Sequence, residues 1–245
     1  MVEKDVTSRK RVLLKLSGEV FGNPEAGLCI DPSAYLDFAE RLKMAHDTGT
    51  EIAVVIGGGN IFRGLTGEGL GTDRVIGDTM GMLATMINSL ALSAACRNIG
   101  LPACVMSSTH MPKTSEMYVR DRADKHLRSG RIVIIGGGTG NPFFTTDSAA
   151  ALRAAELGAD VLLKATKVDG IYSTDPMKDE NAKLYKTITY DEALRQRLKI
   201  MDSAAFSLCR ENGIPIIVFN FFKTEELNRA LKGEPAGTLV RTEYN

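Results

Sequence analysis

The stretch RIVIIGGGTGNPFFTTDSAA, Arg131–Ala150, decides the fold class of this chain. An apolar run leads into four glycines within five positions, and a helix start follows at Asp147. Apolar runs without polar alternation are typical of strands buried on both faces of a parallel sheet. A strand, a glycine turn and a helix in this order therefore predict one unit of an α/β fold.

Comparable apolar runs recur along the chain and alternate with segments of helical periodicity. The predicted strands are Arg11–Leu16, Glu51–Ile56, Pro102–Met106, Arg131–Gly136, Asp160–Ala165 and Pro215–Asn220. The predicted helices are Pro32–Thr48, Asp73–Asn98, Ser115–Ser129, Asp147–Leu157, Asp191–Arg197, Ser203–Asn212 and Thr224–Leu231. This alternation predicts a three-layer α/β/α sandwich around a mainly parallel central sheet. No low-complexity linker interrupts it, so we expect a single domain over residues 1–245.

The composition is that of a globular chain with balanced charge. Its 245 residues suffice for a substantial core, and 44% of them are hydrophobic. Lysine plus arginine number 30 and aspartate plus glutamate 30, which argues against non-specific nucleic-acid binding. The cysteines form no CxxC pair, the histidines form no HExxH motif, and no apolar run reaches the roughly 18 residues of a membrane helix. We therefore expect a cytoplasmic protein with reduced thiols, no nucleic-acid partner and no membrane partner.

The segment TMGMLATMINSLALSAAC, Thr79–Cys96, is apolar on nearly every face. A helix of this kind is normally buried all round. It can lie within a large core, or it can bury one face against a second copy of the chain. Of these alternatives we favour the oligomer interface.

Three predicted strands end in glycine turns that lead towards helices. They are LLKLSGE (Leu13–Glu19), VVIGGGNIFRG (Val54–Gly64) and the stretch quoted above. Ligands of parallel α/β sheets bind beyond the carboxyl ends of the strands, where glycine lets backbone N–H groups approach an anion. One such turn is explained by a tight connection, but three at one edge predict a nucleotide or phosphate site. The dipeptide GK and the pattern GxGxxG are both absent from the sequence, which excludes a P-loop and a dinucleotide fingerprint.

Positive charge for such a site is available near the strand ends. Lys15, Arg63 and Lys164 can converge on this edge, although a lysine beside a strand is more often solvated. Asp147 can cap a helix, or it can orient the lysine side chains. Tyr172 can pack on a nucleotide base, or it can be an ordinary turn tyrosine.

Six motifs together carry a resemblance to a known family. They are LLKLSGE, VVIGGGNIFRG, GDTMGMLAT (Gly77–Thr85), GTGNPFFTTDSAA (Gly138–Ala150), LLKATKVDGIYSTDP (Leu162–Pro176) and IMDSAAF (Ile200–Phe206). With them the chain resembles the bacterial uridylate kinases of the amino acid kinase superfamily, from Arg11 to about Val240. GTGNPFFTTD with KATKVDG is highly specific, whereas the glycine clusters alone are not.

The resemblance implies the reaction ATP + UMP giving ADP + UDP in pyrimidine nucleotide biosynthesis. Mg²⁺ is expected mainly through the nucleotide phosphates, with no metal site of protein ligands. The family is hexameric and inhibited by UTP, and some members are activated by GTP. The segment linked to the GTP response reads VFGNPEAGLCID (Val20–Asp31) and is longer than the family pattern.

The resemblance also carries a pattern of site residues. The ATP pattern falls on Lys15, Leu16, Ser17, Gly18, Gly59, Arg63, Thr166, Tyr172 and Asp175. The UMP pattern falls on Gly58, Asp78, Thr139, Gly140, Asn141, Pro142, Phe143, Phe144, Thr145 and Thr146. Asp147 matches the family's organising aspartate, while the role of Asp202 is left open. Residues 11–160 then form mainly the UMP side and residues 161–245 mainly the ATP side.

The chemistry agrees with these residues. The second pKa of a phosphate monoester is about 6, so UMP is already a nucleophile near neutral pH and needs no general base. We expect Lys15 and Lys164 to stabilise the transferred phosphoryl group and Arg63 to hold adjacent phosphates. Three alternatives remain: a nucleotide sensor without activity, a related kinase acting on a carboxylate or carbamate, and a dehydrogenase. The sensor would not need the transfer cations, and the run TGNPFFTTD argues against the other kinases.

Overall fold

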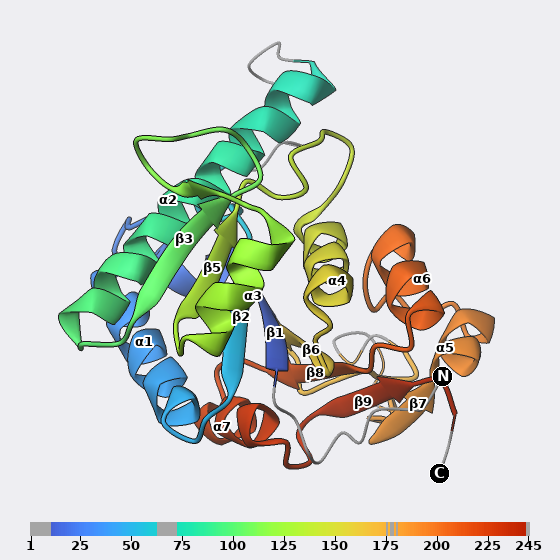
Figure 1. Cartoon of the computed structure of the whole chain (residues 1–245). Coiled ribbons are helices and arrows are strands. Elements are labelled where there is room, and N and C mark those ends of the chain that lie inside the picture. Colours follow the sequence, from blue (N-terminus) through green and yellow to red (C-terminus); the bar gives the residue numbers. More distant parts are fainter. Residues whose placement is uncertain (1–10, 63–72, 175, 177–178, 180, 244–245) are drawn as a thin grey trace.

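A computed structural model describes residues 11–62, 73–174, 176, 179 and 181–243. The strands are β1 (Arg11–Leu16), β2 (Glu51–Ile56), β3 (Ala103–Ser107), β4 (Glu116–Met117), β5 (Ile132–Gly136), β6 (Val161–Thr166), β7 (Thr187–Thr189), β8 (Ile216–Asn220) and β9 (Thr238–Arg241). The helices are η1 (Gly18–Phe21, a 3₁₀ helix), α1 (Pro32–His46), α2 (Arg74–Asn98), α3 (Arg120–Arg128), α4 (Thr146–Leu157), α5 (Tyr190–Arg195), α6 (Ser203–Glu211) and α7 (Thr224–Lys232). Figure 1 shows these elements around one twisted sheet.

The sheet is mainly parallel, as predicted. Its described strands follow the order β4-β3-β5-β2-β1-β6-β8-β9-β7. All the pairings are parallel except that between β8 and β9. The central strands β1, β2, β5 and β6 are apolar along most of their length because helices cover both faces of the sheet.

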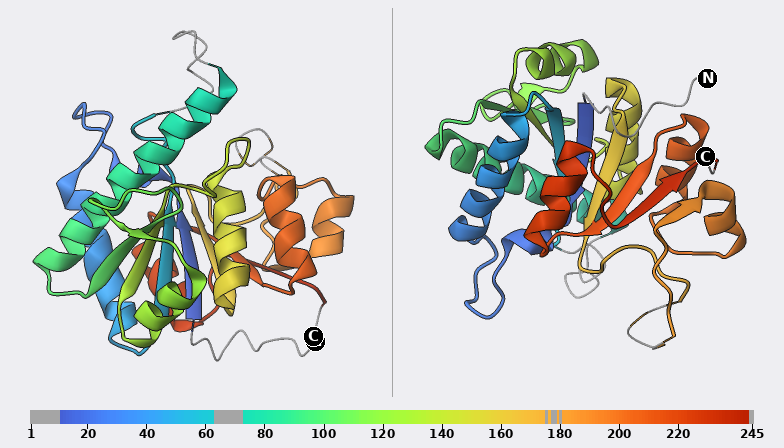
Figure 2. Two further views of the ribbon diagram at one scale, coloured as in Figure 1. Left: turned by 45° about the horizontal axis from the view of Figure 1, so that its top comes forward. Right: turned by 90° about the horizontal axis from the view of Figure 1, so that it is seen from below.

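Two hydrophobic layers lie on opposite faces of the sheet. Helices α1, α2 and α7 pack on one face over the side chains of Val12, Leu14 and Leu16. Helices α3, α4, α5 and α6 pack on the other face, to which Leu13 and Leu162 belong. Figures 1 and 2 show the resulting three layers, which confirm the predicted α/β/α sandwich.

Two kinds of element differ from the sequence-based expectations. The helix expected over Ser115–Ser129 is wrong at its start, because Glu116–Met117 pair with β3 and α3 begins only at Arg120. Strands β7 and β9 were not expected. They are three and four residues long, too short for a periodic signal. Strand β9 forms by pairing with β8, and β7 forms at the edge by pairing with β9.

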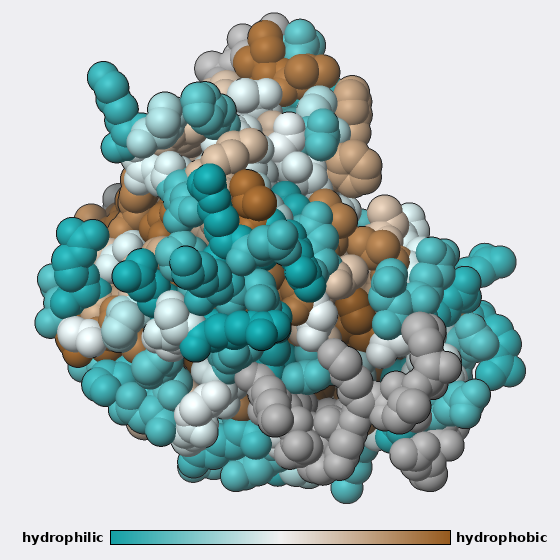
Figure 3. All heavy atoms as spheres, in the orientation of Figure 1, coloured by the Kyte–Doolittle hydropathy of each residue, from teal (hydrophilic) through white to brown (hydrophobic). Residues whose placement is uncertain are grey.

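Helix α2 presents apolar side chains to the outside as well as to the core. Leu83, Ile87 and Leu90 are 38–46% exposed on one stripe, while Leu92 and Cys96 are fully buried. Figure 3 shows apolar residues at the top of the molecule, over the amino-terminal end of this helix. Among the described residues α2 alone has the length and mean hydropathy of a membrane span, and 44% of that apolar window is buried inside the protein. The oligomer interface expected here remains a prediction.

Candidate active site

The strand order brings two lysines side by side. Strands β1 and β6 are parallel neighbours, and their register pairs Lys15 with Lys164. Both lysines occupy strand positions that face α4, on the same side of the sheet as Leu13 and Leu162. The carboxyl ends of β1, β2, β5 and β6 therefore form one edge that carries the glycine turns and both ammonium groups.

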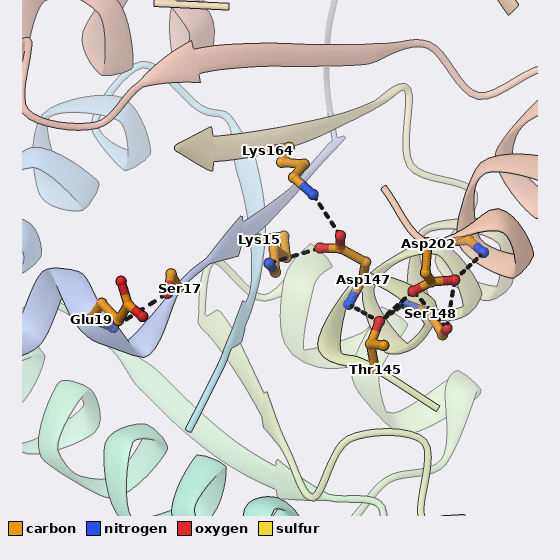
Figure 4. A network of polar contacts seen from close by, with 9 residues as sticks. Lys15, Ser17, Glu19, Thr145, Asp147, Ser148, Lys164 and Asp202 are labelled. Atoms are coloured by element: carbon orange, nitrogen blue, oxygen red, sulfur yellow. Dashed lines mark hydrogen bonds and ion pairs between the residues drawn. The ribbon is translucent and has the colours of Figure 1, made fainter. Parts of the chain in front are cut away.

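Asp147 joins the two lysines from the first turn of α4. Its Oδ1 lies 2.7 Å from Nζ of Lys15, and its Oδ2 accepts a hydrogen bond of 2.5 Å from Nζ of Lys164. Each of the three side chains is only 13% exposed. Figure 4 shows both lysines pointing from the sheet towards this carboxylate. We call Lys15, Asp147 and Lys164 the lysine–aspartate cluster.

Burial and charge oppose each other in this cluster. Burial by itself raises the pKa of Asp147. The charges of Lys15 and Lys164 lower this pKa by a larger amount, so it lies below its ordinary value. Burial also lowers the pKa of Lys164, and the attraction of Asp147 only partly offsets this effect. Two ammonium groups and one carboxylate leave one positive charge in excess, which suits a site that receives an anionic phosphoryl group.

The start of α4 is fixed by its own cap. Thr145 is the N-cap residue, and its Oγ1 accepts hydrogen bonds from the backbone N–H groups of Asp147, at 3.0 Å, and of Ser148, at 3.3 Å. This cap satisfies two amide groups that the helix leaves unpaired. The carboxylate of Asp147 thus sits at the positive end of the helix dipole.

The turns after β1 and β2 pack against each other with no room for side chains. The N–H of Gly57 donates to the carbonyl of Leu16 at 2.9 Å. A Cβ atom on Gly58 would lie 2.7 Å from Cβ of Ala84, and one on Gly18 would collide with the carbonyl of Gly57. These glycines are therefore required for a close backbone approach.

The run Thr139–Thr146, which we call the acceptor loop, is tied to the start of α2. The carboxylate of Asp78 accepts a hydrogen bond of 2.7 Å from the N–H of Phe143, and it lies 2.9 Å from Nε of Arg74. Within the loop, Oγ1 of Thr139 accepts from the N–H of Asn141 at 3.1 Å. Phe143 has a positive φ of 70° and is 62% exposed, so its conformation is held by these contacts and not by burial.

The remaining site predictions fall into three groups. Leu16 is fully buried, so only its backbone can face a nucleotide. Thr166 ends β6 and donates its hydroxyl to the carbonyls of Val168 and Phe219, while Tyr172 forms a bridge with Leu184 in the following segment. Arg63 and Asp175 lie outside the described residues. The structure brings Lys15, Ser17, Gly18, Gly58, Asp78, Asp147, Lys164 and the acceptor loop to one edge, and their roles with nucleotides remain predictions.

Two polar groups were not recognised as part of the arrangement from the sequence. Asp202, the N-cap residue of α6, accepts hydrogen bonds from the hydroxyl groups of Thr145 and Ser148. Asn88 is fully buried in α2 and donates to the carbonyl of Gly57 at 2.7 Å. The sequence signals a helix cap at Asp202. It does not signal the contact with α4, because that contact depends on how the two helices pack.

The residues of this edge can accommodate Mg²⁺ only as a companion of the nucleotide. Among the described residues, no three acidic, cysteine or histidine side chains gather into a metal site. Both oxygens of Asp147 face lysines, which leaves this carboxylate unsuited to direct coordination. Mg²⁺ commonly binds through substrate phosphates and water in sites of this kind.

Comparisons with known proteins agree with this geometry. The model of the Amino acid kinase family matches residues 10–220. The structure of UMP kinase from Bacillus anthracis is 39% identical, with a TM-score of 0.92, over 96% of this chain and 97% of that chain. UMP kinase from Ureaplasma parvum is 36% identical, with a TM-score of 0.91, over 96% of this chain and 100% of that chain. Uridylate kinase from Archaeoglobus fulgidus is 27% identical, with a TM-score of 0.73, over 94% of this chain and 99% of that chain.

These matches confirm the resemblance that the motifs carry, over nearly the whole length of the chain. The chain therefore belongs to the amino acid kinase family.

Proposed function

We propose that the protein is a UMP kinase, which transfers the γ-phosphoryl group of ATP to the phosphate of UMP. The observation that carries the proposal is the lysine–aspartate cluster beside the acceptor loop, a mostly buried site with one positive charge in excess. Two bacterial UMP kinases that share 39% and 36% of the sequence and almost the entire fold support the same activity.

In the proposed reaction a phosphate oxygen of UMP attacks the γ-phosphorus of ATP. The bond from this phosphorus to the β,γ-bridging oxygen breaks, and ADP leaves with that oxygen. The UMP phosphate is mostly ionised near neutral pH, because its second pKa is about 6, so the step needs no general base.

The chain's own residues contribute position and charge. Lys15 and Lys164 approach the phosphoryl group from two neighbouring strands and stabilise the negative charge on its oxygens. Asp147 keeps the two ammonium groups together and so prevents their mutual repulsion from separating them. The acceptor loop and Asp78 would hold UMP, with Arg63 on adjacent phosphates. Bound with ATP, Mg²⁺ would neutralise part of the phosphate charge.

The alternatives make different demands on this site. A nucleotide sensor uses cations to bind phosphates, but it does not need two buried lysines placed to stabilise a transferred group, and burying their charge costs folding free energy. A carboxylate or carbamate kinase can share the fold, but it does not require the acceptor loop that Asp78 fixes. A dehydrogenase would need a dinucleotide fingerprint, and the sequence has none.

We extend the proposal to assembly and regulation on the strength of the family resemblance. We expect a cytoplasmic homohexamer that UTP inhibits. GTP, which activates some members of the family, is the candidate activator. The exposed apolar stripe of α2 at Leu83, Ile87 and Leu90 supports association between copies.

An acceptor panel tests the proposed reaction. Purified protein with ATP and Mg²⁺ is supplied separately with UMP, CMP, N-acetylglutamate and carbamate, and ADP and the phosphorylated product are both quantified. We expect UDP from UMP in amounts equal to ADP. Binding of UMP and ATP without UDP formation would favour the sensor, and turnover of carbamate or N-acetylglutamate without turnover of UMP would favour the other kinases.

A further inference from the structure

We propose that Asp202 is a positioning residue for phosphoryl transfer, because its carboxylate joins the amino-terminal ends of α4 and α6 and thereby fixes Asp147. The expected effect on kcat rests on the proposed function. The hydrogen-bonded link between α4 and α6 does not depend on that function. Figure 4 shows the chain of contacts from Asp202 through Thr145 to Asp147 and the lysines.

The two oxygens of Asp202 serve two different helices. Oδ1 accepts a hydrogen bond of 2.8 Å from the N–H of Ala205 and so caps α6. Oδ2 accepts the hydroxyl hydrogen of Thr145, the residue that caps α4. The hydroxyl of Ser148, which is 7% exposed, lies within 3.1 Å of both oxygens. A single carboxylate therefore links two helix starts that are distant in the sequence.

The direction of these hydrogen bonds is what makes the link specific. The Thr145 hydroxyl has one hydrogen, and it is donated to Asp202. The lone pairs of the same oxygen are then free to accept from the N–H groups of Asp147 and Ser148. A carboxylate at position 202 only accepts, so it holds the hydroxyl in the orientation that the helix start requires.

Asparagine cannot perform both tasks. It has one acceptor oxygen and one NH₂ group, which only donates. If the oxygen faces Ala205, the NH₂ group faces Thr145 and competes with the helix amides for the hydroxyl lone pairs. If the oxygen faces Thr145, the cap of α6 is lost. In the first case the start of α4 is released, and the carboxylate of Asp147 moves with it. In the second case the start of α6 is released, and residue 202 is no longer fixed beside Thr145.

The effect reaches the reaction through Asp147. This carboxylate contacts both lysines at 2.5 and 2.7 Å, so a shift of the first turn of α4 displaces the groups that stabilise the transferred phosphoryl. Misplacement of catalytic groups by about 1 Å costs up to roughly 10²-fold in rate. The charged groups that face Lys164 are Lys15 on β1, Asp147 on α4 and Asp202 at the start of α6.

The test compares Asp202→Asn with a matched control, Asp31→Asn. Asp31 also caps a helix, accepting from the N–H of Ser33 at 2.9 Å, but it makes no contact with α4 among those described. Both variants lose part of an aspartate cap, and both should lose a similar amount of thermal stability. Only Asp202→Asn should lower kcat, by about 10- to 100-fold, with little change in KM for ATP and UMP. A purely structural cap would make the two variants behave alike.

Amide hydrogen exchange provides a readout that does not depend on activity. Exchange at the N–H groups of Asp147 and Ser148 should accelerate about fivefold to tenfold in Asp202→Asn and stay unchanged in Asp31→Asn, as expected for a lost N-cap. Unchanged exchange at these two amides would overturn the inference, as would full kcat in Asp202→Asn. Wild-type protein that forms no UDP would instead refute the proposed function, while the exchange result would still decide whether the link exists.

Discussion

Replacement of Lys164 by methionine separates the catalytic contribution of the cluster from its contribution to folding. Methionine keeps the length and most of the volume of the side chain but removes the ammonium group. After the change, Lys15 and Asp147 remain as an ion pair of 2.7 Å without excess charge. The structure therefore predicts opposite directions for activity and stability.

The loss of activity follows from the position of Lys164. Its side chain is 13% exposed, so its attraction for a phosphoryl oxygen is only partly screened by water. At about 4 Å and an effective dielectric constant of about 20, one pair of unit charges interacts by roughly 4 kcal/mol. We expect kcat to fall by about 10²–10³-fold, or roughly 3–4 kcal/mol, in line with the loss of other preorganised charges.

The expected effect on stability has the other sign. Burial lowers the pKa of Lys164 more than Asp147 raises it, so the protonated side chain opposes folding at every pH below its folded pKa. Methionine removes this cost, and the melting temperature should stay the same or rise.

The assay is UDP formation at saturating ATP and UMP, with thermal unfolding measured on the same samples. The control is Lys43→Met, which removes an exposed lysine paired with Asp47 at 2.8 Å on α1. This control should keep full activity and change the stability by less than about 1 kcal/mol. If Lys164→Met keeps turnover within about threefold of wild type, Lys164 does not stabilise the transferred group, and the reasoning fails.

Three further predictions test separate parts of the site. Gly58→Ala should lower stability by about 1–3 kcal/mol in thermal unfolding, because its Cβ would lie 2.7 Å from Cβ of Ala84. The control Gly59→Ala should not lower it, since its Cβ has no neighbour closer than 4.0 Å, and equal melting temperatures of the two variants would contradict this reasoning. Asp78→Ala should raise KM for UMP about tenfold with little change in kcat, because the acceptor loop loses a charged hydrogen-bond acceptor, and an unchanged KM would refute that role. The lysines hold the pKa of Asp147 below 3.8, so the stability that its charge contributes is present above that pH and is lost as the pH falls through the lower folded pKa. In urea unfolding, the stability of Asp147→Asn should therefore fall less steeply with acid than that of wild type, and parallel falls would contradict the ion-pair account.

The sequence predicts the central part of the fold because that part is apolar on both faces. The runs around Leu13, Ile134 and Leu163 have no other stable location than a covered parallel sheet. The short strands β4, β7 and β9 cannot be predicted in this way, since two to four residues carry no periodic pattern. Their conformation depends on a neighbouring strand that the sequence does not identify.

The sequence predicts the individual residues of the site but not the contacts between them. Lys15, Lys164 and Asp147 stand out as polar side chains at the ends of apolar strands and at a helix start. Their contact depends on β1 and β6 being neighbours in register, although most of the chain lies between them. The link from Asp202 to Thr145 likewise depends on the packing of α6 beside α4, which no local pattern specifies.

The most direct test of the central claim is a single-turnover measurement of UDP formation by wild type and by Lys15→Met, with both nucleotides bound before Mg²⁺ is added. The claim is that the paired lysines accelerate phosphoryl transfer from ATP to UMP. It predicts that the variant still binds both nucleotides but forms UDP about 10²–10³-fold more slowly. Equal single-turnover rates in the folded variant and the wild type would contradict it.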